Sequence, residues 1–369
     1  MNTNARIPFL ATLAVAVLVV ALLVVGRGGG SGPSASPSPS ASSASSSASG
    51  SKSPVGSSSP SGSVALTKLS VGLGFIPSVQ FAQFYLAQRA GYYRDAGLNA
   101  TFQNKIDPDL IALVGQGALD IGIADGTSII PAVSQNIPVR YIATVYAQFP
   151  NVVYAKASSG IKTAADLRGR KLGTPGKYGS SWIMLQALLG SAGLKTSDVD
   201  IQLYPDFGQG AALQQGAVDA ATGFVNNEPV QLQLSGTTAT ILRVDSIVPL
   251  PGNGLITSTD SLAAKHDALK GFVAATLRAE NDIIADPQKG LDAAVAAVPD
   301  LGKDKATQMA ILNATIETWQ SDYTKVNGLG AIDRDAWTKS ITFMSGLPDK
   351  PVARAVTVDE LVSEELLAK

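Results

Sequence analysis

A short αβ unit occurs twice in this 369-residue chain. The first copy, Gln116–Asp125, reads QGALDIGIAD, and the second, Gln215–Pro229, reads QGAVDAATGFVNNEP. Each copy has a glycine where a helix is expected to end, then an aspartate, then a short run of small apolar residues. Glycine supplies the left-handed backbone that closes a helix, and a short apolar run suits a strand covered on both faces. The repetition therefore predicts two α/β lobes of similar design.

Short apolar segments alternate with helical segments along much of the chain, which predicts parallel sheets. The expected strands are Leu66–Leu73, Leu98–Phe102, Ile121–Ala124, Val139–Val145, Val152–Ala155, Lys171–Gly173, Ile201–Tyr204, Ala220–Phe224 and Thr240–Val244. From Ser261 onward the apolar residues repeat at helical spacing, as in Leu269–Leu277. We expect this C-terminal helical segment to pack on the first lobe.

The N-terminal region carries an apolar run, Phe9–Val25, within residues 1–27. Its about 17 residues suit either a short membrane span or a long signal-peptide core. Residues 28–63 are almost entirely Ser, Gly, Pro and Ala. Such a composition buries too little apolar surface to fold and is typical of a disordered linker. We therefore expect an uncleaved signal anchor, or a cleaved signal peptide, and an extracytoplasmic location tethered to the cell membrane.

Composition and motifs argue against several functions. A net charge of −1 gives no reason to expect nucleic acid as a partner. The chain has no cysteine and one histidine, His266, so thiolate and histidine metal sites are not expected. Gly72-Leu73-Gly74 lacks the third glycine of a dinucleotide loop, and Asp206-Phe207-Gly208 matches only three letters of a kinase. We expect no catalytic residue, no metal and no cofactor.

A binding cleft is the functional site that the pattern favours, because ligands bind beyond the carboxyl ends of strands in open α/β sheets. The residues after the two repeats should then face each other. Glu228 is the strongest candidate for a ligand contact. Its carboxylate could accept hydrogen bonds from a heterocyclic N–H group. Alternatively, it could serve only to stabilise the N-terminus of a helix through the helix dipole. The candidate ligand-binding residues are Ile76, Ser78, Gln80, Phe81, Asp125, Thr127, Tyr178, Ser180, Ser181, Trp182, Asn226, Asn227 and Glu228.

Two of these groups have specific expected roles. Ser180 and Ser181 begin a helix, where hydroxyls and free N–H groups bind an anionic or carbonyl group, or serve only as a helix cap. Tyr178 and Trp182 could form a stacking wall for a flat ring.

Several motifs together resemble the substrate-binding proteins of ABC importers, in the branch that binds thiamine pyrimidine precursors, riboflavin, sulfonates, nitrate and taurine. The matching segments span about residues 66–260 and are Phe75-Ile76-Pro77, Gln83-x-Tyr85-x-Ala87, Gly91–Leu98, Gly117–Gly122, Thr163–Gly173 and Val218–Pro229. The resemblance implies a two-lobed α/β fold of the type II periplasmic-binding-protein class, with a C-terminal helical segment. It places the first lobe at 64–148 and 252–369, the second at 149–251, and the hinge crossings near Tyr146–Tyr154 and Val244–Leu255.

The resemblance also implies a function. The protein would capture a small aromatic nitrogen heterocycle, riboflavin or the thiamine pyrimidine precursor, and deliver it to an ABC permease and its ATPase. It would act as a monomer. Phe75 and Gln80–Phe81 replace the tryptophan and histidine that pyrimidine binders often have, which leaves riboflavin open. The alternatives are a sulfonate, nitrate or taurine binder and a membrane-tethered ligand sensor. The related fungal enzyme uses a histidine and a cysteine cluster, whereas this chain has no cysteine and His266 as its one histidine.

Overall fold

The computed structural model describes residues 65–105, 109–347 and 350–367, which belong to one compact unit, Gly62–Lys369. The expected signal segment and linker, residues 1–63, lie outside the described residues. None of the helices in the described ranges combines the length and apolar character needed to cross a membrane.

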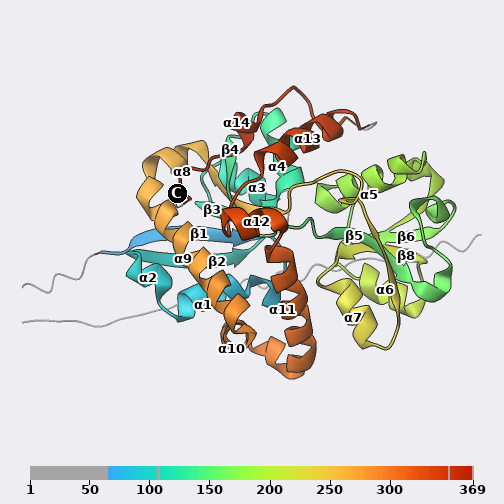
Figure 1. Ribbon diagram of the computed structural model, residues 1–369, viewed down its shortest axis with the longest axis horizontal. Coiled ribbons are helices and arrows are strands. Elements are labelled where there is room, and N and C mark those ends of the chain that lie inside the picture. Colours follow the sequence, from blue (N-terminus) through green and yellow to red (C-terminus); the bar gives the residue numbers. More distant parts are fainter. Residues whose placement is uncertain (1–64, 106–108, 348–349, 368–369) are drawn as a thin grey trace, which may run out of the picture. The chain divides into compact units, whose positions relative to one another are not determined.

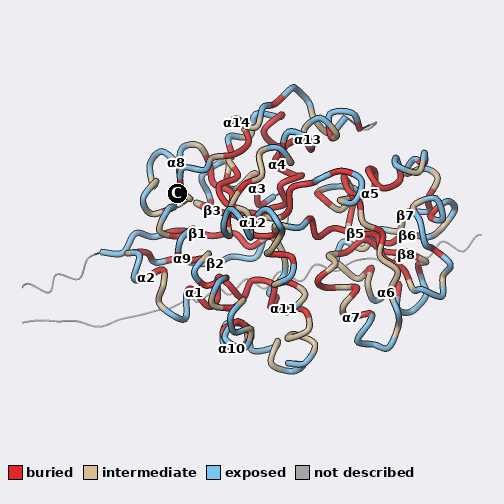
Figure 2. Tube along the Cα trace, in the orientation of Figure 1, coloured by how far each residue is buried: buried red, intermediate tan, exposed pale blue. Residues whose placement is uncertain are grey.

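Two five-stranded sheets form the centres of two lobes (Figure 1). The first sheet has the strand order β2-β1-β3-β10-β4 and the second has the order β7-β6-β8-β5-β9. The strands are β1 Thr67–Leu73, β2 Leu98–Asn104, β3 Ile121–Asp125, β4 Val139–Thr144, β5 Asn151–Lys156, β6 Lys171–Thr174, β7 Asp200–Leu203, β8 Ala220–Phe224, β9 Ala239–Arg243 and β10 Asn253–Ser258. The central strands of both sheets are buried (Figure 2). The predicted two-lobed α/β fold is confirmed.

Helices connect and cover the strands. The first lobe contains α1 Ala82–Arg89, α2 Tyr92–Asp95, α3 Asp109–Gly115 and α4 Gly126–Ser134, and the second contains α5 Gly179–Ser191, α6 Gln209–Gln215 and α7 Glu228–Leu234. The C-terminal helices are α8 Thr259–Ala264, α9 His266–Ala285, α10 Pro287–Ala297, α11 Lys305–Trp319, α12 Asp322–Asn327, α13 Arg334–Ser345 and α14 Val358–Leu361. Short 3₁₀ turns lie at Val79–Phe81, Ala157–Ser159, Ala164–Leu167, Thr196–Asp198 and Pro299–Asp304.

The repeated αβ unit has the same local structure in both lobes. Gly117 and Gly216 adopt left-handed backbone angles, with φ values of 74° and 78°, just after α3 and α6. The aspartate that follows binds the neighbouring strand in each copy: Ser70 N donates to Asp120 Oδ2 over 2.8 Å and Lys171 N donates to Asp219 Oδ2 over 2.9 Å. Each aspartate thus joins the start of the following strand, β3 or β8, to the parallel neighbour of that strand, which is β1 in the first lobe and β6 in the second.

One strand in each sheet runs against the others, which corrects the expectation of parallel sheets throughout. β10 pairs antiparallel with β3 and β4, and β5 pairs antiparallel with β8 and β9. These are the two strands through which the chain enters a lobe after crossing from the other, so no helix reverses the chain before them. The chain crosses from β4 to β5 and returns from β9 to β10. The lobe boundaries proposed from the sequence lie in these connections and remain a proposal.

The C-terminal helices complete the core of the first lobe, as predicted. Phe272 of α9 is fully buried and stacks on Tyr93, with ring centroids 4.7 Å apart and an interplanar angle of 4°. On another side Phe272 meets Phe84 of α1 at 6.3 Å. Buried residues of α10 and α11, including Leu291 and Leu312, belong to the same apolar cluster. The first lobe therefore depends on residues that are nearly two hundred positions apart in the chain.

Candidate functional site

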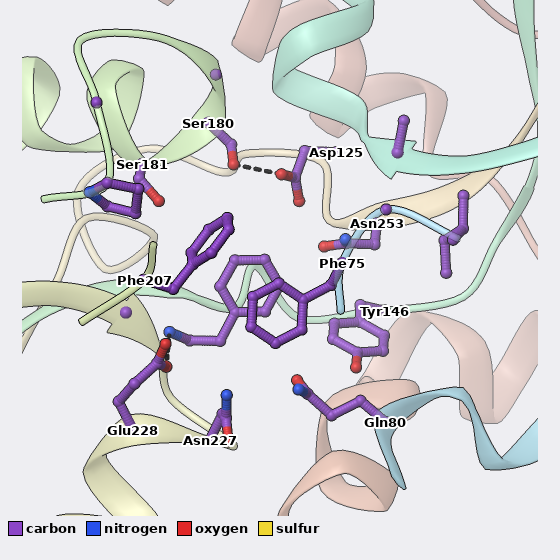
Figure 3. Close-up of a pocket in the computed structure, with 18 of the residues that line it drawn as sticks. Phe75, Gln80, Asp125, Tyr146, Ser180, Ser181, Phe207, Asn227, Glu228 and Asn253 are labelled. Carbon is purple, nitrogen blue, oxygen red and sulfur yellow. Dashed lines mark hydrogen bonds between the residues drawn. The ribbon is translucent and has the colours of Figure 1, made fainter. Parts of the chain in front are cut away.

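A cavity lies between the two lobes at the carboxyl ends of β1, β3 and β8, and we call it the inner cavity (Figure 3). Its lining comes from both sheets and from the crossing segments, which is the position that the repeat predicts. The lining residues are Gly74, Phe75, Gln80, Phe81, Ile123, Ala124, Asp125, Tyr146, Pro175, Gly176, Tyr178, Gly179, Ser180, Ser181, Phe207, Gln209, Gly223, Phe224, Asn227, Glu228 and Asn253.

Asp125 joins the two lobes by a hydrogen bond. It is the last residue of β3, and its carboxylate accepts a hydrogen bond from the Ser180 hydroxyl in the first turn of α5 (Figure 3). Asn151 Nδ2 donates to Ser180 Oγ over 3.1 Å, and Ser181 Oγ donates to Asn151 Oδ1 over 2.8 Å. The two serines are therefore fixed in a chain of hydrogen bonds that ends on Asp125, and the simple helix-cap role is not the one observed.

Burial raises the pKa of the Asp125 carboxyl to about 6, although the Ser180 hydrogen bond acts in the opposite direction. A carboxyl with a raised pKa stabilises the folded state below its unfolded pKa, and this contribution is lost as the pH rises through the folded pKa. We expect the melting temperature of wild type minus that of Asp125→Asn to fall by a few degrees between about pH 4 and pH 7. Melting curves of both proteins across this range test it, and a constant difference would contradict it.

Two other buried carboxyls contribute to the pH dependence of stability in the same direction, so the Asp125→Asn variant is needed as a reference. Burial also raises the pKa of the Glu228 and Glu280 carboxyls, so wild type alone would report all three groups together. The difference from Asp125→Asn isolates Asp125, because the other two groups are unchanged in the variant.

Asn226 forms a second polar link between the lobes. This fully buried side chain follows β8 in the second lobe, and its Nδ2 donates to Gln80 Oε1 over 3.0 Å and to Thr315 Oγ1 over 2.8 Å. Gln80 and Thr315 belong to the first lobe, in the turn before α1 and in α11. Asn226 Nδ2 also lies 3.4 Å from the hydroxyl of Tyr146, in the segment where the chain first crosses between the lobes. These partners are buried polar groups, so their hydrogen bonds favour the conformation in which the lobes are in contact.

Glu228 begins α7 and lies at the wall of the inner cavity (Figure 3). Its Oε2 accepts the backbone N–H of Phe224 over 2.9 Å. A side chain at Gly223 would place its Cβ 2.9 Å from this oxygen, so glycine is needed for the carboxylate to approach the strand. Burial raises the pKa of Glu228, and the Phe224 hydrogen bond opposes the rise. One carboxylate oxygen is thus fixed to the backbone, which orients the other.

Aromatic rings from both lobes meet at the centre of the site. Phe75 of the first lobe and Phe207 of the second lie edge to face, with centroids 5.0 Å apart and an interplanar angle of 85° (Figure 3). Tyr146 and Phe224 make a similar edge contact at 6.4 Å. Rings in such positions provide the apolar surfaces on which a flat ligand stacks.

Phe207 has an unusual backbone. Its φ of 61° lies in the left-handed region, which a bulky side chain adopts only at an energetic cost. The turn is held by two hydrogen bonds, from Phe207 N to Tyr204 O over 2.9 Å and from Gly208 N to Asp206 Oδ1 over 3.1 Å. Strain of this kind occurs most often at functional sites, where the surrounding structure compensates for it.

The structure brings together most, but not all, of the residues proposed from the sequence. The inner cavity is lined by Gln80, Phe81, Asp125, Tyr178, Ser180, Ser181, Asn227 and Glu228. The other five proposed residues, Ile76, Ser78, Thr127, Trp182 and Asn226, do not line it.

Each of these five residues has another environment. Ile76 is 51% exposed, and the Ser78 hydroxyl caps the following turn by accepting Gln80 N over 3.2 Å. Thr127 is fully buried, and Asn226 bonds the opposite lobe as described above. Trp182 packs on the core of the second lobe, with Lys177 Nζ 5.8 Å from its ring centroid. The stacking wall expected from Tyr178 and Trp182 is therefore not formed.

Several lining residues were not proposed from the sequence, chiefly Phe75, Tyr146, Phe207, Gln209, Phe224 and Asn253. Phe207 lies in the segment Asp206–Gly208, which resembles a kinase motif only by its letters. The position of Phe207 between β7 and α6 could have indicated a site residue. It lies beyond the carboxyl end of its strand, at the same end of the sheet as Glu228. Phe75 has the equivalent position after β1.

Three hydrogen-bond acceptors of the lining residues lack a partner within the described ranges. Asp125 Oδ1, Gln209 Oε1 and Asn253 Oδ1 are buried and have no hydrogen-bond partner among the described residues. Asp125 and Glu228 add negative charge, whereas no lysine or arginine belongs to the lining in the described part of the chain. The chemistry suits a neutral or cationic ligand that donates hydrogen bonds, because buried acceptors need donors.

The described residues contain no cluster of three histidine, cysteine, aspartate or glutamate side chains that could hold a metal ion. His266 lies at the start of α9, outside the cavity, with Nδ1 3.1 Å from Asp267 Oδ1.

Comparison with known proteins identifies the family. Residues 78–290 match the family described as NMT1/THI5 like. The chain is 31% identical over 307 residues to the riboflavin-binding protein RibY of Chloroflexus aurantiacus, covering 81% of this chain and 87% of the relative. It is 23% identical over 282 residues to a 4-amino-5-hydroxymethyl-2-methylpyrimidine phosphate synthase, THI5, of Saccharomyces cerevisiae, covering 71% of this chain and 82% of the relative.

Solved structures show the same fold at low sequence identity. The alkanesulfonate-binding protein SsuA from Xanthomonas axonopodis pv. citri aligns with a TM-score of 0.64 at 17% identity, covering 81% of this chain and 98% of SsuA. The aliphatic sulphonate binding protein SsuA from Escherichia coli aligns with a TM-score of 0.63 at 16% identity, covering 80% of this chain and 97% of that protein. The chain has the two-lobed fold of periplasmic binding proteins and belongs to the NMT1/THI5-like family.

Proposed function

We propose that this protein is an extracytoplasmic solute-binding protein that captures a flat, neutral nitrogen heterocycle in the inner cavity and delivers it to an ABC permease and its ATPase. Riboflavin is the ligand we favour, with the thiamine pyrimidine precursor second. The two lobes close on the ligand, and no reaction takes place. The permease would recognise the closed form, so ligand binding acts by shifting the population of conformations.

The acceptor-rich, acidic lining of the inner cavity is the observation that carries this proposal. Three unpaired acceptors and the carboxylate of Glu228 fit the N–H groups and hydroxyls of such a ligand. Phe75, Tyr146 and Phe224 supply ring surfaces for stacking. The relative RibY is named as a riboflavin-binding protein and matches along most of both chains, which supports the same ligand class.

A sulfonate, nitrate or taurine ligand is the alternative within the same class of protein. An anion would have to enter a cavity with two carboxylates and no described lysine or arginine in its wall, which opposes binding by like-charge repulsion. The SsuA proteins share the fold at 17% identity or less, and a likeness at this identity is evidence for the fold alone.

An enzyme and a sensor are alternatives from other classes. Some relatives are named as pyrimidine phosphate synthases, at 23% to 26% identity. The absence of cysteine and the position of His266 outside the cavity argue against a comparable reaction in this chain. A tethered sensor would use the same cleft, and a neighbouring kinase gene instead of a permease gene would favour it.

The proposal for residues 1–63 concerns the location of the protein. We propose that the apolar segment holds the protein at the outer face of the cell membrane, as a signal anchor or until a signal peptidase cleaves it. The Ser/Gly/Pro/Ala-rich linker would then act as a tether for a monomeric binding domain.

The experiment that tests the ligand is the absorbance spectrum of the protein purified without refolding, followed by a thermal-shift series. A visible flavin band, or a melting temperature raised by riboflavin, supports the proposal. A melting temperature raised by an alkanesulfonate or nitrate but unchanged by riboflavin and by the pyrimidine would overturn it.

Glu228→Gln is expected to weaken riboflavin binding by about 1–3 kcal/mol, the range of a hydrogen bond to a charged group. Glutamine can still accept the Phe224 N–H, so the fold of this turn should be preserved while the negative charge is lost. Quenching of flavin fluorescence during titration measures the affinity. Asp200→Asn is the matched control, because it removes a carboxylate of the same lobe that lies outside the cavity. Equal affinity of Glu228→Gln and wild type would remove Glu228 from the site.

A further inference from the structure

A second hollow adjoins the inner cavity, and we call it the outer chamber. It lies between the lobes as well and shares four wall residues with the inner cavity: Phe75, Phe207, Asn227 and Glu228. Its remaining lining is Ile76, Pro77, Ser78, Asp206, Gly210, Ala211, Gln214, Gln231, Leu232, Leu301, Gln308 and Ile311. The Phe75–Phe207 pair therefore forms part of the partition between two spaces in one cleft.

The partition limits which part of a ligand can lie where. The two rings are in edge contact at 5.0 Å, which leaves no space for an aromatic ring between them. A flat ring must therefore lie wholly on one side. A thin chain could pass beside the pair, along Asn227 and Glu228, because both of these residues line both spaces.

The two spaces differ in chemistry. The inner cavity has aromatic walls and the buried acceptors of Asp125, Gln209 and Asn253. Asp125 does not line the outer chamber, whose lining combines the amides of Gln214, Gln231 and Gln308 with the aliphatic side chains of Leu232, Leu301 and Ile311.

Two of these amides are available to a ligand. Among the described residues, no hydrogen bond uses the side-chain amide of Gln214 or Gln308. Gln231 Nε2 donates to Asn227 Oδ1 over 2.8 Å. Amides both donate and accept, which suits hydroxyl groups.

Charge distinguishes hydroxyl groups from phosphate in the outer chamber. Asp206 and Glu228 belong to its wall, and none of its described wall residues is lysine or arginine. A phosphate at the end of a ligand chain would meet two like charges with no cation to offset them.

We propose that the outer chamber is a second subsite, which binds a neutral, hydroxylated chain attached to the ring in the inner cavity and rejects the phosphorylated form of the same ligand. This inference rests on the proposed function. It assigns the specificity for the chain to Gln308 and Gln214, on opposite lobes, so both lobes contact the chain when the cleft is closed.

Three flavin probes test the proposal in binding titrations. Riboflavin carries the hydroxylated chain, lumiflavin has the same ring system with a methyl group in place of the chain, and riboflavin 5′-phosphate adds the phosphate. We expect riboflavin to bind about tenfold or more tightly than either of the others, the scale of one or two hydrogen bonds or of a close like-charge pair. Gln308→Leu should lower the affinity for riboflavin about fivefold to tenfold and leave that for lumiflavin unchanged.

A variant that adds a positive charge tests the rejection of phosphate. Gln214→Lys replaces the amide by an ammonium group, which can still donate to a hydroxyl and places a cation at the outer chamber. We expect it to raise the affinity for riboflavin 5′-phosphate, relative to that for riboflavin, about tenfold. Gln215→Lys, on the next residue of α6 and outside the lining, is the matched control and should change neither affinity.

The outcomes separate the two proposals. If riboflavin and lumiflavin bind equally well and both variants behave as wild type, the outer subsite is wrong and the proposed function stands. If no flavin binds to the wild-type protein, the proposed riboflavin ligand is wrong, and the proposal of a second subsite is wrong as well.

Discussion

Replacing Asn226 by alanine is expected to weaken ligand binding by about 2–4 kcal/mol, roughly 30-fold to 1,000-fold, although Asn226 does not line the inner cavity. The Nδ2 group of Asn226 donates to Gln80 and Thr315 across the two lobes. Without it, closing the cleft would bury these acceptors unpaired, whereas in an open cleft water would bind them. The lost hydrogen bonds therefore make closure of the cleft less favourable, and the free energy of ligand binding becomes weaker by the same amount.

Riboflavin titration of three variants measures this effect. Thr315→Val removes one of the acceptors of the Asn226 amide and should weaken binding less than Asn226→Ala. The double variant should cost about as much as Asn226→Ala alone, because the two residues share one interaction. Additive losses would show that Asn226 and Thr315 do not act through their mutual hydrogen bond. An unchanged melting temperature of the ligand-free variants checks that each lobe remains folded.

Phe272→Ala is expected to lower the free energy of unfolding by about 3–5 kcal/mol, the cost of removing a fully buried phenyl ring. The ring stacks on Tyr93 at 4.7 Å and on Phe84 at 6.3 Å, so its removal leaves a space among three elements, α1, α2 and α9. The melting temperature should fall by on the order of 10 °C.

Denaturant unfolding of Phe272→Ala and of Tyr93→Phe separates ring packing from hydrogen bonding. Tyr93→Phe keeps the stack and removes only the hydroxyl that lies 2.9 Å from Thr276 Oγ1. We expect it to cost about 1 kcal/mol. A loss below about 1 kcal/mol for Phe272→Ala would mean that the core of the first lobe closes over the space, or that the stack contributes little.

The fold was predictable because its signals are local. Gly117 and Gly216 mark helix ends by a backbone conformation that glycine adopts without cost, and the structure has both glycines in that conformation. The direction of β5 and β10 was not predictable in the same way. It follows from the path of the chain between lobes, and no pattern within a strand records whether its neighbours run parallel or antiparallel.

The site was predictable only in part, because strand ends are easier to recognise than side-chain directions. Asp125 and Glu228 follow strands and line the inner cavity. Successive helical residues point about 100° apart, so Ser181 reaches the cavity while Trp182 packs on the core of its own lobe. Asn226 and Asn227 also differ, and only the second lines the cavity. Sequence position alone could not decide which of two neighbours would face the other lobe.

The left-handed backbone of Phe207 has a consequence for the evolution of this site. Glycine or asparagine would occupy the same turn at a lower energetic cost, by about 1–3 kcal/mol for strain of this kind. We expect an aromatic ring to be retained at this position only if its contribution to ligand binding is at least as large as this strain energy. Selection of random variants for thermal stability should therefore enrich glycine and asparagine at position 207, whereas selection for ligand capture should retain phenylalanine. Position 207 is a point where stability and affinity compete, and sequence drift there would report which of the two a lineage has favoured.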